Sequence, residues 1–179
     1  AAGASASVRV AAALFSPSRG DVAGNLARID RLMSEAARNG ANLVVFPECA
    51  ITGLDFTDRA SALASALNDG DDALRMLSQR CRAYHVECVV GALARSGDHF
   101  QNVAFLIGSA GVIGRYDKAH LPRFGADQFA ASGQSGFRVF QAAAGRIGIL
   151  IGYDLGFPEA ARTLALAGAE IIALPTAWP

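Results

Sequence analysis

The chain has 179 residues, of which 52% are hydrophobic and 18% are charged, a composition typical of one packed globular domain and unlike that of disordered proteins. Sixteen basic and sixteen acidic side chains cancel, and no long run of like charge occurs. The sequence therefore gives no sign of a nucleic-acid partner or of an anionic membrane surface. Its longest apolar stretches are interrupted before the ~20 residues that a membrane-spanning helix needs.

The pattern of apolar residues predicts an α/β protein. In chain order it indicates a strand over residues 8–15, a helix over 22–36, a strand over 43–47, a helix over 71–84, strands over 87–93, 102–107 and 112–116, a long loop over 121–136, strands over 137–140 and 146–151, a helix over 158–168 and a strand over 171–174. Asp21 is placed to cap the first helix and Gly40 to end it, while Pro158 opens the last helix and Gly168 closes it.

The two ends of the chain and its cysteines complete the outline. Residues 1–7 are small and polar and lack the regions of a signal peptide, so we expect a flexible leader followed by one domain over residues 8–179. The chain stops just past a predicted buried strand, which would leave an uncovered strand edge, so we expect a fold that is incomplete at the C-terminus. Three cysteines without C-x-x-C spacing argue against a disulfide framework or a structural zinc site, and a reducing cytoplasm is the expected compartment.

Two charged residues follow predicted strands in a way that suits catalysis. Glu48 comes directly after an apolar strand and Pro47, and burial there would raise the pKa of its carboxyl toward the range of a general base. Lys118 follows another strand and precedes the long loop, where a fixed ammonium would stabilise an oxyanion. Taken singly, each also fits an ordinary exposed residue at the start of a loop.

A third strand end has the shape that presents a nucleophile. Residues 146–151 form an apolar run that leads into a tight turn and then into the helix at Pro158. Such a strand–turn–helix elbow holds the residue at its tip beside backbone N–H groups, which suits a nucleophile and an oxyanion hole. The residue at the tip, however, is Gly152, which has no side chain.

Together these segments resemble the carbon–nitrogen hydrolases of the nitrilase superfamily. The motifs that carry the resemblance are Phe46-Pro47-Glu48, Lys118-Ala119-His120-Leu121-Pro122, the run Ile151-Gly152-Tyr153-Asp154-Leu155-Gly156-Phe157-Pro158-Glu159 and the end Leu174-Pro175-Thr176-Ala177-Trp178-Pro179. The resemblance covers nearly the whole chain. It implies a four-layer α-β-β-α sandwich, a homodimer or higher homo-oligomer, and hydrolysis of the non-peptide C–N bonds of small amides, N-carbamoyl compounds or nitriles, with no metal or organic cofactor.

The resemblance also assigns roles to residues. Glu48 would be the general base, Lys118 would stabilise the tetrahedral intermediate, and position 152 would carry the cysteine thiol that forms a thioester. The family often has a second glutamate in the loop after the lysine, and here Asp127 or Gln128 would serve instead. Tyr153 and Trp178 are the other candidates for contact with substrate, although Trp178 equally fits a core or interface aromatic.

Gly152 is the main departure from the family pattern. Without the thiol no thioester forms, so we expect no useful turnover of amides. Three explanations stay open: a deliberate substitution, a natural loss through a single base change, or a pocket kept only for binding. Cys49 is a poor substitute because, beside Glu48 on an extended chain, its side chain points to the opposite side. A non-catalytic pseudoenzyme that binds a small ligand or a partner chain is therefore the alternative function.

Lesser expectations concern four other positions. Gly156 stands where the family commonly has arginine, so a charge near the elbow is missing. His120 is expected to order the Lys118 loop through hydrogen bonds more than to shuttle protons. Cys81 and Cys88 are expected to be small buried apolar residues in a helix and a strand.

Overall fold

The computed structural model describes residues 7–177 as an α/β protein with two β-sheets. Its elements in chain order are β1 (Val10–Ala12), α1 (Val22–Arg38), β2 (Leu43–Val45), α2 (Arg59–Ser65), α3 (Asp72–Tyr84), β3 (Glu87–Ser96), β4 (His99–Gly108), β5 (Gly111–Asp117), the 3₁₀ helix η1 (Gly125–Gln128), β6 (Val139–Ala142), β7 (Gly145–Ile149), the 3₁₀ helix η2 (Gly152–Gly156), α4 (Pro158–Leu166) and β8 (Ile171–Ala173).

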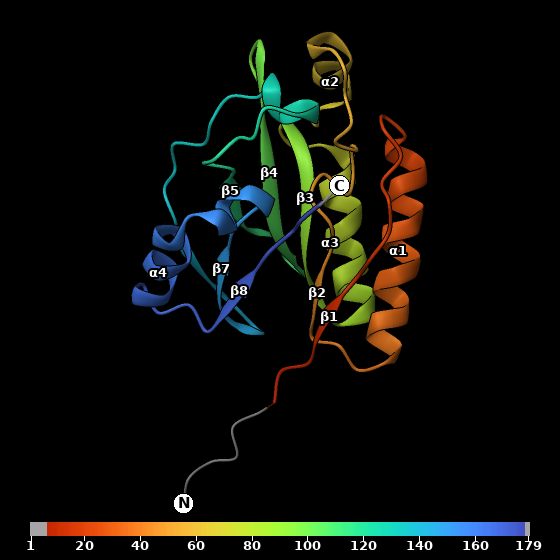
Figure 1. Cartoon of the computed structure of the whole chain (residues 1–179). Coiled ribbons are helices and arrows are strands. Elements are labelled where there is room, and N and C mark those ends of the chain that lie inside the picture. Colours follow the sequence, from red (N-terminus) through yellow and green to blue (C-terminus); the bar gives the residue numbers. More distant parts are fainter. Residues whose placement is uncertain (1–6, 178–179) are drawn as a thin grey trace, which may run out of the picture.

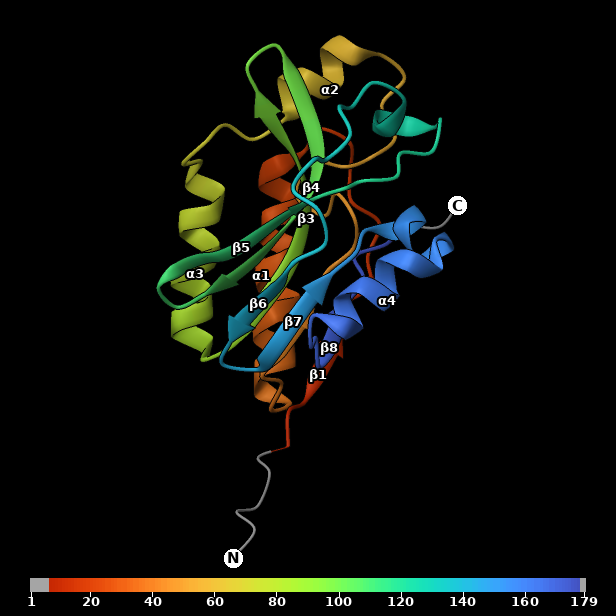
Figure 2. The ribbon, with the colours of Figure 1, turned by 90° about the vertical axis from the view of Figure 1, so that its left-hand side faces the viewer.

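The elements stack in the order helix, sheet, sheet, helix. A five-stranded sheet has the order β1-β2-β3-β4-β5, in which the first three strands are parallel and β4 and β5 are antiparallel additions. A three-stranded sheet has the order β6-β7-β8. Helices α1 and α3 cover the outer face of the larger sheet, and α4 covers the smaller one (Figures 1 and 2). The expected four-layer sandwich is therefore confirmed.

Strand β3 shows how the sequence builds these layers. Successive side chains of a strand point to opposite faces of the sheet. Val90 accordingly packs with Met33 of α1 and Leu77 of α3, whereas Val89 packs with Ile147 of β7 in the layer between the sheets. A strand buried on both faces needs an apolar run without alternation, and β3 has one.

Most of the predicted elements are confirmed, with shifted ends. Asp21 accepts a hydrogen bond from the Gly24 N–H at 3.0 Å as the N-cap of α1, and Gly40 follows that helix with a φ of +77°. Strand β1 is much shorter than the predicted run because it pairs with β2 over only three residues. Helices α2 and η1 were not predicted. Residues 1–6 of the expected leader lie outside the described residues.

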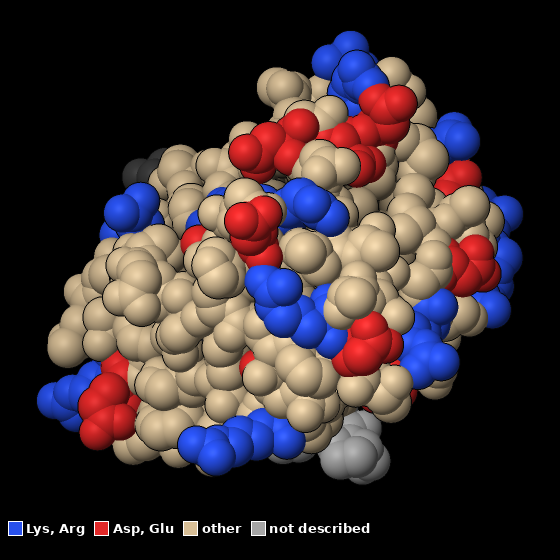
Figure 3. All heavy atoms as spheres, turned by 90° about the horizontal axis from the view of Figure 1, so that it is seen from above, with Lys and Arg blue, Asp and Glu red and all other residues tan. Residues whose placement is uncertain are grey.

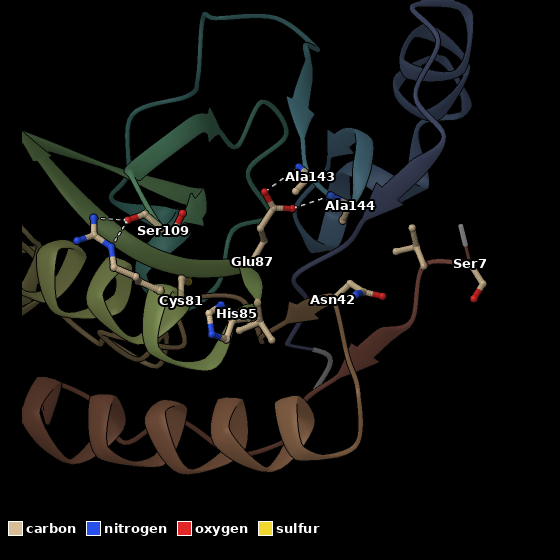
Figure 4. A pocket seen from close by; sticks show the side chains of 11 residues that line it. Ser7, Asn42, Cys81, His85, Glu87, Ser109, Ala143 and Ala144 are labelled. Carbon is tan, nitrogen blue, oxygen red and sulfur yellow. Dashed lines mark hydrogen bonds between the residues drawn. The ribbon is translucent and has the colours of Figure 1, made fainter. Parts of the chain in front are cut away.

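Glu87 joins the two sheets at the end of the sandwich where β3 begins. Its carboxylate accepts hydrogen bonds from the backbone N–H groups of Ala143 at 2.8 Å and Ala144 at 2.9 Å, which lie in the turn between β6 and β7 (Figure 4). The side chain is 9% exposed, so most of its surface is shielded from water. Glu87 therefore connects the larger sheet to the hairpin of the smaller one.

We expect Glu87→Ala to lower the free energy of unfolding by about 2–3 kcal/mol, because two backbone N–H donors, one of them buried, lose a charged acceptor. Urea unfolding monitored by circular dichroism measures this change. Glu35→Ala is the matched control, since Glu35 lies on the exposed side of α1 at 4.0 Å from Arg31, and it should cost less than about 0.5 kcal/mol. Equal effects of the two substitutions would contradict the role given to Glu87.

The surface and the helices agree with the composition. Seen from above, basic and acidic side chains lie side by side without a large area of one sign (Figure 3). Within residues 7–177, no helix combines the length and the apolar character required to cross a membrane.

Candidate active site

Glu48 lies in the turn that follows β2, and the neighbouring strand β3 makes room for that turn. Its side chain is only 2% exposed. A β-carbon at Gly91 of β3 would lie 2.4 Å from the Cys49 nitrogen, 2.8 Å from the Pro47 oxygen and 2.9 Å from the Glu48 Cα. These are backbone atoms that cannot move aside cheaply, so the close crossing of the Glu48 turn over β3 requires glycine at position 91.

Lys118 follows β5 and is buried, with 1% of its side chain exposed. Its Nζ lies 2.5 Å from Glu48 Oε1 and 2.5 Å from Asp127 Oδ2, so the ammonium donates to two carboxylates. An ammonium has three N–H donors, and these two bonds leave one for another acceptor. We call Glu48, Lys118 and Asp127 the buried charged cluster.

Asn102 of β4 fixes the two carboxylates relative to each other. Its Nδ2 donates to Glu48 Oε1 and to Asp127 Oδ1, both at 2.7 Å, and the side chain is fully buried. Asn102 was not among the residues predicted for the site. A polar amide inside the apolar run of residues 102–107 was the available signal, because a buried amide requires hydrogen-bond partners.

Burial and charge move the pKa values of the cluster in directions that suit acid–base chemistry. Burial raises the pKa of Glu48, and the charge of Lys118 only partly opposes that rise. The pKa of Asp127 is raised for the same reason. Burial by itself would lower the pKa of Lys118, but the charges of Glu48 and Asp127 outweigh it and raise that pKa. The cluster therefore holds a charged lysine beside carboxyls that bind a proton more readily than usual.

Gly152 begins η2, three residues after the end of β7, and faces Glu48. Its φ is +43°, in the left-handed region that favours glycine. A β-carbon on this residue would lie 2.6 Å from Glu48 Oε2. The backbone N–H of Gly152 donates to the Pro175 oxygen at 2.9 Å, which ties the elbow to the segment after β8. Any side chain at position 152 therefore points at the carboxylate of Glu48.

Asp154 connects the elbow to the Lys118 loop. Its Oδ2 accepts from the Ile151 N–H at 3.0 Å and from the Tyr116 hydroxyl at 2.8 Å. Its Oδ1 accepts from the His120 backbone N–H at 3.0 Å and lies 2.8 Å from His120 Nδ1. The His120 ring also stacks on Phe157. These contacts favour the ordering role expected for His120. They also anchor Tyr116 and His120, which stand two residues before and after Lys118, and so fix the position of Lys118.

A pocket of about 520 Å³ reaches the charged cluster at Glu48. It is lined by Leu14, Phe15, Ser16, Pro17, Pro47, Glu48, Leu54, Asp55, Phe124, Thr176 and Ala177. The Ala177 N–H donates to Glu48 Oε2 at 3.3 Å, and the buried Thr176 hydroxyl has no hydrogen-bond partner among the described residues. The pocket thus combines apolar lining residues with a few polar ones, among them Glu48 and Asp55.

The structure brings some of the expected site residues together and separates others. Glu48, Lys118, Asp127 and position 152 converge. Tyr153 does not join them: it is 45% exposed, and its ring packs edge-on against Phe157. Trp178 lies outside the described residues.

Two further candidate residues, Gln128 and Cys49, do not join the buried charged cluster. Gln128 is exposed and donates to the Gly125 oxygen, so Asp127 is the one that contacts Lys118. The Cys49 sulfur lies in a core with Leu93 and Phe100, with Asn102 Oδ1 at 3.5 Å. Burial raises the pKa of the Cys49 thiol, which disfavours a thiolate there.

Metal ligands do not gather anywhere in the part of the chain that the structure describes. No group of three or more His, Cys, Asp or Glu side chains within residues 7–177 is arranged to hold a metal ion. The carboxylates of the charged cluster are already bonded to the ammonium of Lys118.

Comparisons with known proteins identify the family of this chain. The family model for carbon–nitrogen hydrolases matches residues 9–178. A nitrilase from Pyrococcus abyssi is 36% identical over 170 residues, which cover 94% of this chain and 64% of that protein. An N-carbamoylputrescine amidase from Solanum lycopersicum is 30% identical over 168 residues, which cover 88% of this chain and 54% of that protein. The chain thus spans less than two thirds of the length of these curated relatives.

A solved structure shows the same fold. An amidase from Nesterenkonia sp. superposes with a TM-score of 0.83 at 24% identity, over 96% of this chain and 65% of that one. The family model spans residues 9–178 and the Pyrococcus abyssi nitrilase is 36% identical, so this chain belongs to the carbon–nitrogen hydrolase family.

Proposed function

We propose that this domain is built to hydrolyse the non-peptide C–N bond of a small amide, N-carbamoyl compound or nitrile, and that Gly152 leaves it without its nucleophile. The observation that carries the proposal is the position of residue 152, whose β-carbon would lie 2.6 Å from Glu48 Oε2. A nucleophile and its base must lie within hydrogen-bond reach of each other. The names of the relatives, nitrilase and N-carbamoylputrescine amidase, support the substrate class.

Each group has a definite task once a thiol stands at position 152. Glu48, with its raised pKa, takes the thiol proton, and the thiolate attacks the substrate carbon. The remaining N–H donor of Lys118 stabilises the oxyanion of the tetrahedral intermediate. Glu48 then gives its proton to the leaving amine, which leaves a thioester, and it activates the water that hydrolyses this thioester. Asp127 and Asn102 hold Glu48 and Lys118 in place.

The glycine form of the chain supports a second candidate, a binding protein for the same class of small molecule. The pocket of about 520 Å³ and the charged cluster are both present without the thiol. Glu48, Asp55 and Thr176 are among the polar residues beside the apolar lining that a small amide or N-carbamoyl compound would contact there. Binding without hydrolysis, measured by calorimetry with small amides and N-carbamoyl compounds, distinguishes this function from catalysis.

The test of the hydrolase proposal is the variant Gly152→Cys. It is mixed with a panel of amides, N-carbamoyl compounds and nitriles, and its intact mass is followed for an acyl adduct while released ammonia or amine is assayed. An adduct at residue 152 together with product release supports the proposal. A folded variant that forms no adduct and releases no product from any member of the panel overturns it.

A further inference from the structure

Two cysteine thiols lie in contact at the end of the sandwich away from the charged cluster. Cys81 Sγ, near the end of α3, is 3.7 Å from Cys88 Sγ, in β3. Both side chains are fully buried, and both are free thiols. The third cysteine, Cys49, lies in a different core with Leu93 and Phe100. The chain thus has one close thiol pair and one isolated thiol.

The local fold holds this pair together. His85 ends α3 in the left-handed conformation, with a φ of +55°, and so turns the chain back into β3 within a few residues. Cys88 is paired with Val44 on one side and Ile107 on the other, and the Cys81 thiol donates to the Ile107 oxygen at 3.5 Å. An S–S bond is about 2.05 Å long, so oxidation requires the two sulfurs to approach from contact distance.

A pocket lies beside one of the two cysteines. Cys81 lines a pocket of about 500 Å³, together with Arg82, His85 and Glu87 (Figure 4). The hydrogen bond between the two thiols lowers the pKa of Cys81 and raises the pKa of Cys88. Cys81 lines the pocket and Cys88 does not, so Cys81 is the member of the pair placed to react first and Cys88 the member placed to resolve the product.

We propose that Cys81 and Cys88 are an oxidation site that a peroxide converts into an internal disulfide between α3 and β3. The Cys81 thiolate attacks one oxygen of the peroxide, the O–O bond breaks, and Cys81 becomes a sulfenic acid while water is released. The Cys88 sulfur then attacks the Cys81 sulfur, the S–O bond breaks, and a second water leaves. Both thiols are oxidised, the peroxide is reduced, and the chain loses two hydrogen atoms. The site does not depend on the proposed hydrolase activity.

The arginines around the pair make the test direct. Trypsin cleaves after Arg80, Arg82 and Arg95, so Cys81 and Cys88 fall into separate peptides, 81–82 and 83–95. The full chain is treated with hydrogen peroxide, alkylated to block free thiols, digested and analysed by mass spectrometry. We expect peptide 81–82 joined to peptide 83–95, with the loss of two hydrogen atoms, and recovery of the separate peptides after dithiothreitol.

Two variants and one internal standard make the result decisive. Cys49→Ser should form the same linked peptides, and Cys88→Ser should stop at a sulfenic acid on Cys81 that dimedone traps. Oxidation of Met76, which is partly buried on α3, reports the peroxide dose. The proposal is overturned if Met76 is fully oxidised while the linked peptides stay absent from the unsubstituted chain. It is equally overturned if Cys49 enters disulfides as readily as the pair does.

Discussion

Gly152→Cys should raise the rate of hydrolysis of a suitable small amide or N-carbamoyl compound by about 10⁴-fold or more over the unsubstituted chain, because the groups of a nucleophilic site act as a unit and fail together. The new side chain points at Glu48 Oε2, so the base needs no rearrangement of the backbone to reach the thiol. Steady-state release of amine or ammonia, measured on both proteins with the same substrate, gives the ratio.

Gly152→Ala is the matched control for this gain. Alanine and cysteine both place a β-carbon on a residue with a φ of +43°, so each should cost about 1–2 kcal/mol in the free energy of unfolding. The β-carbon also displaces the end of the Glu48 side chain in both variants. Only cysteine should gain hydrolysis. Equal rates for the two variants, with both folded, would contradict the assignment of position 152 as the site of the nucleophile.

Lys118→Met should destabilise the fold by about 3–5 kcal/mol at pH 8, because it leaves two buried carboxylates without their cation. Glu48 and Asp127 each lie 2.5 Å from the ammonium that this substitution removes, and both are buried. Urea unfolding of the variant and of the unsubstituted chain at the same pH measures the difference. Lys118→Met with Asp127→Asn is the control: it removes one of the stranded charges and should recover part of the loss.

The loss caused by Lys118→Met should shrink as the pH falls toward 5. The pKa values of Glu48 and Asp127 are raised by burial even with the lysine present, and without it they should rise further. A carboxyl whose pKa is higher in the folded state than in the unfolded state favours folding at low pH. That contribution disappears as the pH rises through its folded pKa. A loss that stays constant between pH 5 and 8 would show that the carboxylates are not the cause.

The sequence predicted the helices and strands in which apolar residues recur at the spacing typical of that element. Helix α1 has apolar residues at helical spacing behind an Asp21 cap, and both features were visible. Helix α2 was missed because its seven residues are mostly alanine and serine, and only Ala62 among them is buried. The length of β1 was overestimated because pairing with β2, which the sequence does not show, limits it.

The members of the buried charged cluster were predicted, but the hydrogen bonds and ion pairs that join them were not. The motifs marked Glu48, Lys118 and position 152, and Asp127 was one of two candidates. Burial of Lys118 could not be predicted from its own segment, because one of the two carboxylates that stabilise it, Glu48, lies 70 residues away, and the other, Asp127, lies in the unpredicted helix η1. Asn102 and Asp154 were missed as connecting residues for the same reason: their hydrogen-bond partners lie 25 or more residues away in most cases.

Gly91 sets a requirement for transferring this site to another protein. Gly91 lies on the neighbouring strand and takes no part in the chemistry, but it determines where Glu48 can lie. Any β-carbon at position 91 would collide with the backbone of the Glu48 turn. A graft that copies the acid, the lysine and the elbow but keeps alanine or valine at that point of the recipient sheet would displace the base from its partners. The transferable unit is therefore the charged cluster together with its glycine.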